Sequence, residues 1–290
     1  MTRPTLEDTN RSAGADTVVL IHGLWLTPRS WEHWIPRYEG RGFRVLAPAY
    51  PGFEVEVEAL RADPSQIENV GITEIADHYE AIIRKLDKPP IIMGHSFGGT
   101  VTQLLLDRSV GAAGVCLNSA VVKGIKVVPL PQIRSLFPVL DNPKHRHQAV
   151  GLTPKQFHYA FTNTLTEKES QPLYERYAIA APGGIVWDGA LANFSPNSPA
   201  KVDFKKADRA PLLFIAGGED HVNPPAVNKS NYKHQQQSGA TTHYIEFADR
   251  PHFMLGLDDW QSIADLALAW AVNQTTPAGV REAVGVGASA

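Results

Sequence analysis

The sequence predicts an α/β fold: a mostly parallel central β-sheet with helices on both faces, and an inserted helical cap. Two observations predict it. Short apolar runs of strand length alternate with helical segments over residues 17–120, and the alternation resumes over residues 209–273. Between these parts, residues 121–208 are rich in proline and break the alternation. Strands that alternate with helices are typical of a parallel sheet covered on both faces. We therefore expect a core made of the two alternating parts and a cap made of residues 121–208.

The first part of the core contains four strand candidates. Each is a short apolar or β-branched run bounded by residues that favour turns. The runs are 17–21, 43–47, 91–93 and 114–118. The clearest helix covers 72–86, where apolar residues recur at intervals of three and four positions. A shorter helix opens with Thr27 and Pro28, whereas 53–70 has the charged composition of a loop.

The cap contains two helix candidates. The first covers 154–163 with Thr153 as its N-cap, and the second runs from 166 to 177, where Glu169 completes a capping box. Aromatic residues are frequent throughout the cap, which indicates an apolar pocket beneath it. After the cap, strands and helices alternate again over 211–216, 225–237, 242–247 and 259–272.

Composition limits the function classes. The chain has 290 residues, a formal net charge of −3, 43% hydrophobic residues and one cysteine, Cys116. A near-neutral chain is poorly suited to nucleic acid, and no apolar run reaches the roughly 20 residues that span a bilayer. The N-terminal residues show no secretory signal. We expect a cytoplasmic monomer or homodimer that acts on a small molecule, without nucleic-acid or membrane partners, and with flexible termini at 1–16 and 274–290.

The stretch at residues 90–100 carries the strongest chemical signal. An apolar strand run is followed by Gly94-His95-Ser96-Phe97-Gly98 and then by a helical pattern. A strand, a sharp turn and a helix with Gly-x-Ser-x-Gly at the turn form a nucleophile elbow, which exposes the serine hydroxyl at the edge of the sheet. The pattern therefore predicts Ser96 as a nucleophile.

Three further motifs accompany the elbow. His22-Gly23 follows the first strand, GGEDHVNP covers 217–224, and Pro-His-Phe covers 251–253. Together with GHSFG at 94–98, they make residues 17–272 resemble the α/β-hydrolase family, in which nucleophile, acid and histidine follow in that order. The resemblance implies the α/β-hydrolase fold and a serine esterase or lipase activity. The family often has an antiparallel hairpin before the first strand, and few residues precede position 17 here, so that edge of the sheet should be shorter.

The resemblance implies a catalytic triad of Ser96, His252 and Asp220. A serine hydroxyl needs a base within hydrogen-bond reach, and the base needs a partner that fixes its tautomer. His252 and Asp220 follow consecutive strands, so both should lie at the edge of the sheet that carries Ser96. The alternative acid is Glu219, and the alternative histidines are His95, His221 and His243.

The oxyanion of the reaction requires two N–H donors. We expect the backbone N–H groups of Phe97 and Leu24 to supply them, with Trp25 as the alternative to Leu24. We also expect an apolar pocket lined by Trp25, Phe97, Phe137, Phe157, Trp187 and Phe253. Since no cluster has the spacing of metal ligands, we expect neither a metal nor a cofactor.

These expectations describe a cofactor-free serine hydrolase that cleaves a carboxylic ester of a small-to-medium apolar substrate through an acyl-enzyme. Hydrolysis of an amide, carbamate, lactone or C–C bond, or a lyase reaction, would use the same fold and triad. Outside enzymes, the alternative is a small-molecule receptor with low turnover. A dehalogenase needs a carboxylate at the elbow, where this chain has Ser96.

Overall fold

The computed structural model describes residues 14–276, with a six-stranded sheet at its centre. The strand order is β2-β1-β3-β4-β7-β8, and every neighbouring pair is parallel. The strands are β1 (Thr17–Ile21), β2 (Arg44–Leu46), β3 (Ile91–His95), β4 (Ala113–Leu117), β7 (Leu212–Gly217) and β8 (Thr242–Phe247). The terminal segments expected to be flexible, 1–16 and 274–290, lie outside the described residues except at their inner ends.

The four central strands are buried along their whole length. Their continuous apolar sequences suit a parallel sheet with both faces covered. The two edge strands, β2 and β8, are partly exposed. Backbone register pairs Ile21 with Gly94, His95 with Leu117, and Leu117 with Ile215. The carboxyl ends of the central strands therefore end side by side, and the loops that follow them meet at one edge.

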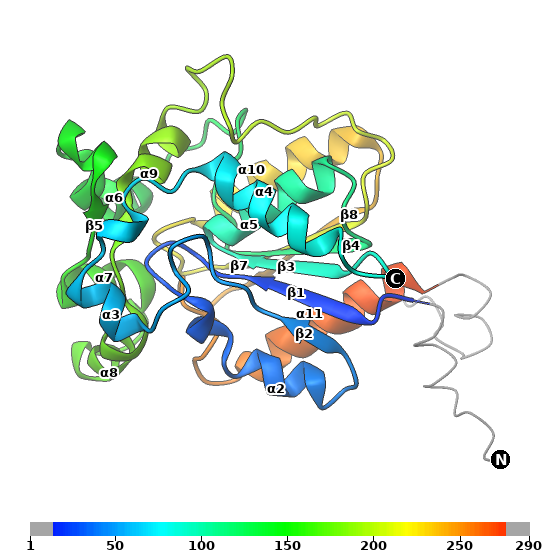
Figure 1. Cartoon of the computed structure of the whole chain (residues 1–290), viewed down its shortest axis with the longest axis horizontal. Coiled ribbons are helices and arrows are strands. Elements are labelled where there is room, and N and C mark those ends of the chain that lie inside the picture. The colour runs from blue at the N-terminus through cyan, green and yellow to red at the C-terminus, as the bar shows by residue number, and fades with distance from the viewer. Residues whose placement is uncertain (1–13, 277–290) are drawn as a thin grey trace.

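Helices cover both faces of the sheet, as predicted (Figure 1). One face carries α2 (Trp34–Glu39) and α11 (Trp260–Thr275), and the other carries α4 (Ile72–Ile83), α5 (Phe97–Asp107) and α10 (Pro225–Gln235). Helix α11 ends three residues later than its apolar pattern predicts. Short 3-10 turns complete the core at η1 (Pro28–Trp31), η2 (Ser65–Ile67) and η4 (Gln236–Ser238).

The cap lies between β4 and β7 in the sequence and forms a group of helices at one end of the sheet (Figure 1). The two predicted cap helices are present, each with a capping box at its N-terminus. The structure adds two helices, a 3-10 turn and a two-stranded antiparallel ribbon. The cap elements are α6 (Leu130–Leu140), η3 (Pro143–His147), β5 (Ala149–Val150), α7 (Pro154–Phe161), α8 (Glu167–Tyr177), β6 (Ala181–Pro182) and α9 (Gly183–Ala190).

The charged segment at 53–70, which the sequence analysis interprets as a loop, contains one further helix, α3 (Val57–Ala62). Val57 and Leu60 are buried on its inner side. Two buried apolar residues in a six-residue helix are too few to show a helical period in the sequence. Figure 1 shows α3 beside the cap helices rather than on the sheet.

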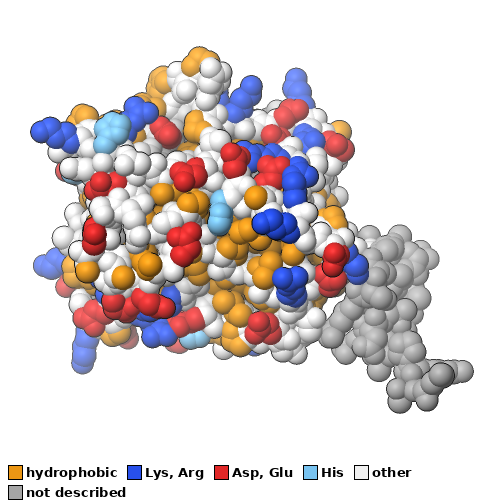
Figure 2. Space-filling view, viewed as in Figure 1, with side chains coloured by type: hydrophobic (Ala, Val, Ile, Leu, Met, Phe, Trp, Pro, Cys, Tyr) orange, Lys and Arg blue, Asp and Glu red, His pale blue; other side chains and the backbone are white. Residues whose placement is uncertain are grey.

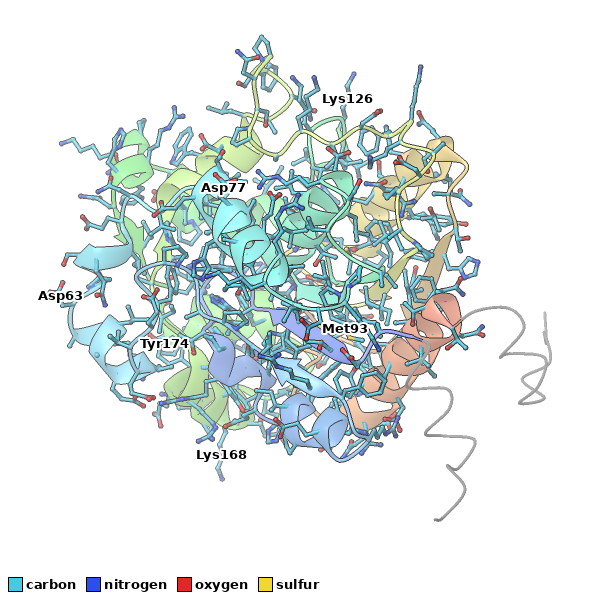
Figure 3. The ribbon with its side chains drawn as sticks, turned by 45° about the vertical axis from the view of Figure 1, so that its right-hand side comes forward. Asp63, Asp77, Met93, Lys126, Lys168 and Tyr174 are labelled. Carbon is cyan, nitrogen blue, oxygen red and sulfur yellow. The ribbon has the colours of Figure 1, made fainter. Side chains whose placement is uncertain are left out.

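Polar contacts join neighbouring helices on each face of the sheet; Asp77 on α4 and Met93 on β3 are labelled in Figure 3. Asp77 on α4 accepts a hydrogen bond of 2.7 Å from Arg108, which follows α5. On the opposite face, the Tyr38 hydroxyl of α2 donates to the carbonyl of Ala264 on α11 at 2.8 Å. It also lies 3.6 Å from the sulfur of Met93 on the central strand β3.

The face shown in Figure 2 carries acidic and basic side chains mixed with exposed hydrophobic ones. This mixture agrees with a formal net charge of −3 for the whole chain. Within residues 14–276, none of the helices combines the length and the apolar character that crossing a bilayer would require.

Candidate active site

Ser96 occupies the sharp turn between β3 and α5. Its backbone has φ 56° and ψ −120°, a combination that non-glycine residues rarely adopt. The segment at the end of β4 makes two hydrogen bonds of 2.9 Å to the turn: Ser96 N–H donates to the carbonyl of Leu117, and Ala120 N–H donates to the carbonyl of Ser96. The end of β4 thus stabilises the strained conformation that presents the hydroxyl.

Glycines flank Ser96 because the strand and helix backbones nearly touch there. A Cβ on Gly94 would overlap the backbone of Gly98, and a Cβ on Gly98 would overlap the carbonyl of Ile21. Gly23, in the loop after β1, would place a Cβ only 2.9 Å from the Cβ of Ser96. All three glycines are required by close approach rather than by a positive φ.

The structure brings Ser96, His252 and Asp220 together from three separate loops. His252 Nε2 lies 2.9 Å from the Ser96 hydroxyl oxygen, and His252 Nδ1 lies 2.8 Å from Asp220 Oδ2. All three residues are at least 96% buried. Since the carboxylate can only accept, Nδ1 donates to Asp220 and leaves Nε2 free to accept the serine proton.

Asp220 is held in place by its second oxygen. Oδ1 accepts hydrogen bonds from the backbone N–H groups of Val222 at 2.7 Å and Asn223 at 2.8 Å. The alternative acid, Glu219, is exposed and makes no side-chain hydrogen bond or ion pair within residues 14–276. Of the two carboxylates, Asp220 is therefore the one that the loop orients toward His252.

Within residues 14–276, His252 is the histidine whose ring hydrogen-bonds Ser96, and the alternative histidines have other partners. His95 packs under His252, with ring centroids 4.8 Å apart and Nε2 at 2.8 Å from the His252 carbonyl. Burial lowers the pKa of His95 well below its ordinary value, so it stays neutral beside the site. His221 bonds the carbonyl of Tyr159, and His243 accepts from Trp270.

Asn118, the residue directly after β4, is a site residue that the sequence analysis did not identify. Its Oδ1 accepts from Gly217 N–H at 2.6 Å, and its Nδ2 donates to the carbonyls of Pro251 and His252, each at 3.0 Å. One amide thus joins the end of β7 to the histidine loop. The available signal was an asparagine directly after a buried strand, a residue type that tolerates the positive φ of 47° found here.

The residues expected to supply the oxyanion donors, Leu24 and Phe97, line the same cavity as Ser96. Phe97 begins α5, and the first N–H groups of a helix have no partner within it. No side chain or carbonyl within residues 14–276 accepts from Leu24 N–H. Both groups are available to a negatively charged oxygen.

His22 braces the loop that carries Leu24. Its Nδ1 bonds the Gly23 carbonyl at 2.9 Å, and its ring stacks on Tyr50 with 3.7 Å between centroids. Tyr50 N–H lies 3.4 Å from the other ring nitrogen, Nε2. Burial lowers the pKa of His22 to about 4, so the neutral form that suits these contacts prevails at neutral pH.

A cavity of about 200 Å³ lies above Ser96, between the core and the cap. Its wall is mostly aliphatic and aromatic, and it draws on the β1 loop, the elbow, α6 and α9. Trp25 links the two parts, because its indole donates to Val150 at 3.0 Å and its carbonyl accepts from Ile179 at 3.0 Å. Residues that represent the wall are Leu24, Trp25, Phe97, Ile125, Leu136 and Val186.

Of the aromatic residues expected in the pocket, Trp25 and Phe97 line this cavity. The prediction that the other four line the pocket is wrong. None of them belongs to the wall of this cavity: Phe137, Phe157, Trp187 and Phe253. Phe157 stacks on Phe161 inside the cap, and Phe253 packs on Tyr177.

Phe137 and Trp187 lie on the two cap helices that the sequence did not reveal. Phe137 is 59% exposed and lines a separate groove between α6 and α7. Trp187 is half-buried on α9, whereas its neighbour Val186 faces the cavity. The phase of each helix decides which side chains point inward, and aromatic composition alone does not reveal that phase.

Comparison with known proteins agrees with this geometry at the level of the family. A family model described as the alpha/beta hydrolase family matches residues 18–287. Comparison with the curated proteins gives no match.

Solved structures share the fold at low sequence identity. An extracellular alpha/beta-hydrolase from a Paenibacillus species is 21% identical, with a TM-score of 0.64, and the match covers 87% of this chain and 98% of that one. A monoacylglycerol lipase from Paleococcus ferrophilus is 19% identical, with a TM-score of 0.61 and coverage of 91% and 97%. Polyneuridine aldehyde esterase is 17% identical, with a TM-score of 0.59 and coverage of 89% and 99%. From its sequence match and its fold, the chain belongs to the alpha/beta hydrolase family.

Proposed function

We propose that the protein is a serine hydrolase that cleaves a carboxylic ester of a small-to-medium apolar substrate through an acyl-enzyme on Ser96. The observation that carries this proposal is the buried hydrogen-bonded chain from Ser96 through His252 to Asp220, which opens into an apolar cavity. A nucleophile, a base and an orienting acid in this geometry are the requirements of covalent acyl transfer.

In the proposed mechanism, Ser96 Oγ attacks the ester carbonyl carbon while His252 Nε2 takes the hydroxyl proton. The carbonyl oxygen becomes an oxyanion, which accepts hydrogen bonds from the N–H groups of Leu24 and Phe97. Collapse of this intermediate breaks the bond to the alcohol, and His252 returns the proton to the departing oxygen. A water molecule, deprotonated by His252, then attacks the acyl group, releases the acid and restores Ser96.

Family membership and the neighbours in fold together favour an ester as the substrate. The alternatives are an amide, a carbamate, a lactone or a C–C bond. Those neighbours include proteins described as a monoacylglycerol lipase, an aldehyde esterase and a pyrethroid hydrolase. The apolar wall of the cavity supports an uncharged substrate, because an unpaired charge is costly to desolvate. The mechanism as proposed uses no cofactor and no metal.

We also propose that the protein acts in the cytoplasm, as a monomer or homodimer, on a small molecule rather than on nucleic acid or a membrane. The near-neutral charge supports a small molecule rather than nucleic acid as the partner, and one neighbour in fold is described as extracellular. Cell fractionation and size-exclusion chromatography test the location and the oligomeric state.

The test of the function combines covalent labelling with turnover. The wild-type protein should react with a fluorophosphonate probe and hydrolyse p-nitrophenyl esters, whereas Ser96→Ala should do neither at an almost unchanged melting temperature. A parallel panel of amides and lactones tests the bond type. Labelling that persists in Ser96→Ala would contradict the nucleophile, and labelling without turnover of any ester would favour a receptor.

A further inference from the structure

The cavity wall contains polar groups at a few positions only. Among residues 14–276, no charged side chain lines it, and the polar ones are Ser96, Thr100, Gln132, Asn193 and Asn223. Thr100 donates to a backbone carbonyl, and both ends of the Asn193 amide bond backbone groups. These two side chains therefore have internal partners already.

Asn223 determines which way the Gln132 amide points. Asn223 Nδ2 donates to the backbone carbonyl of Asn118 at 2.9 Å, and that carbonyl can only accept. The nitrogen of Asn223 must therefore face Asn118, which leaves its oxygen, Oδ1, facing Gln132. Gln132 Nε2 lies 3.3 Å from this oxygen and donates to it. The carbonyl oxygen of Gln132 consequently points elsewhere.

That oxygen, Gln132 Oε1, accepts no hydrogen bond from any residue in the range 14–276. Gln132 is only 6% exposed, and it reaches the cavity from α6 on the face that also presents Leu136. The oxygen itself is open to a bound molecule, because it is not one of the fully enclosed unpaired side-chain atoms among the described residues, and Gln132 lines the cavity. In an otherwise apolar wall, it marks a place where a bound molecule can supply a donor.

We propose that Gln132 determines substrate specificity: the preferred substrate is an uncharged ester with a hydroxyl group close to the scissile carbonyl, and this hydroxyl donates to Gln132 Oε1. The proposal rests on the proposed function, which it makes more specific. A hydroxyl suits the position because it can also accept the second N–H of the Gln132 amide, which an N–H donor alone cannot do.

The position of the hydroxyl follows from the contacts around Asn223. Asn223 Nδ2 lies 3.5 Å from the Ser96 hydroxyl oxygen, and Asn223 Oδ1 accepts the hydrogen bond from Gln132 Nε2. Gln132 is thus separated from the nucleophile by one side-chain amide. A substrate held by both groups carries its hydroxyl a few bonds from the carbonyl, on the second or third carbon of the acyl chain.

The experiment compares matched esters. The probes are the methyl esters of 2- and 3-hydroxyhexanoic acid, the corresponding methoxy acids and hexanoic acid. The methoxy group keeps the electron-withdrawing oxygen but cannot donate, so it separates hydrogen bonding from intrinsic reactivity. For at least one position, kcat/KM of the hydroxy ester should exceed that of its methoxy partner about tenfold, the effect of one hydrogen bond.

Gln132→Met removes the amide at similar length and should reduce this ratio to about one. Gln148→Met makes the same exchange at an exposed cap residue and should keep the wild-type ratio. Equal kcat/KM for hydroxy and methoxy esters at both positions, or an unchanged ratio in Gln132→Met, would overturn the proposal.

A binding measurement separates this inference from the proposed function. Ser96→Ala protein should bind the favoured hydroxy ester about tenfold more tightly than its methoxy partner in calorimetry. That preference without hydrolysis by the wild type would support the specificity and contradict the enzyme. Hydrolysis by the wild type with equal binding of both esters would support the enzyme and overturn the role of Gln132.

Discussion

At the scale of single residues, the geometry of Ser96 depends on neighbouring glycines, which have no Cβ atom. The elbow needs a serine in an unusual backbone conformation, and it needs strand, helix and the β1 loop to approach within contact distance. Glycines at 23, 94 and 98 allow that approach because they have no Cβ. The strain at Ser96 is balanced by hydrogen bonds from β4 and by close packing around the turn.

We therefore expect Gly98→Ala to destabilise the fold by about 3 kcal/mol, because its Cβ would overlap the carbonyls of Ile21 and His22. Urea denaturation followed by circular dichroism measures the change. Gly151→Ala is the matched control, since nothing lies within 4 Å of the Cβ position there. Equal stability of the two variants would refute the close approach.

Asn118 offers a test of positioning at the same scale. Asn118→Gly keeps the positive φ but removes the amide that joins Gly217 to the carbonyls of Pro251 and His252. Because the amide orients the histidine loop rather than binding substrate, kcat should fall about 10- to 100-fold while KM changes little. Fluorophosphonate labelling should slow in parallel. A rise in KM at constant kcat would instead indicate direct contact with substrate.

At the scale of elements, the cap is fastened to the core through α8. Arg61 on α3 donates to the carbonyl of Tyr174 at 2.8 Å and to that of Ala178 at 2.7 Å, which satisfies carbonyls at the C-terminus of α8. Tyr174 is labelled in Figure 3, where it lies close to α3. From the core, Glu32 pairs with Arg176 and accepts from the Tyr177 hydroxyl.

Arg61→Ala should loosen α8 without unfolding the sheet. The lost hydrogen bonds are partly exposed, so we expect a cost of about 1 kcal/mol. Hydrogen exchange measured by mass spectrometry should become faster in residues 167–177 and stay unchanged in β3. Arg84→Ala is the control, because it breaks an ion pair between Glu80 of α4 and Arg84, the residue after α4, away from the cap. Protection of α8 identical to that of the wild type would contradict this docking.

At the scale of the whole molecule, the parallel sheet assembles the site from distant parts of the chain. Positions 96, 220 and 252 follow β3, β7 and β8, and the aligned register brings the loops after these strands to one edge. The same edge buries His22 and His95 in their neutral forms, so the site contributes to the pH dependence of global stability.

Stability should fall as the pH decreases from neutral toward 4. In the unfolded chain His22 takes up a proton near its ordinary pKa of 6.5, whereas in the folded protein its pKa is about 4. Between these values the unfolded state binds more protons, so acid favours unfolding. From pH 7 to pH 5, His22 alone accounts for about 2 kcal/mol. Urea denaturation at both pH values measures the loss, and His22→Gln should reduce it; an equal loss in that variant would contradict this assignment.

The features that the sequence determined by itself depend on neighbouring residues. Apolar runs of strand length, the helical period of α4 and the capping boxes of α7 and α8 are local patterns, and their order along the chain predicts the parallel sheet. The Gly-x-Ser-x-Gly elbow is local as well, because a strained turn needs small residues on both sides. The identification of Asp220 and His252 also drew on motif order, and the structure places His252 beside Ser96 and Asp220 beside His252.

Only the tertiary structure decided which side chains face one another. The helices α3 and α9 are short or begin with glycines, and prolines at 131 and 138 mask the apolar period of α6, so contacts with other elements stabilise all three. The phase of α6 turns Phe137 outward and Gln132 inward. The roles of Asn118, Asn223 and Gln132 arise from hydrogen bonds between residues about 90 or more positions apart, and no local pattern in a single sequence encodes such pairs.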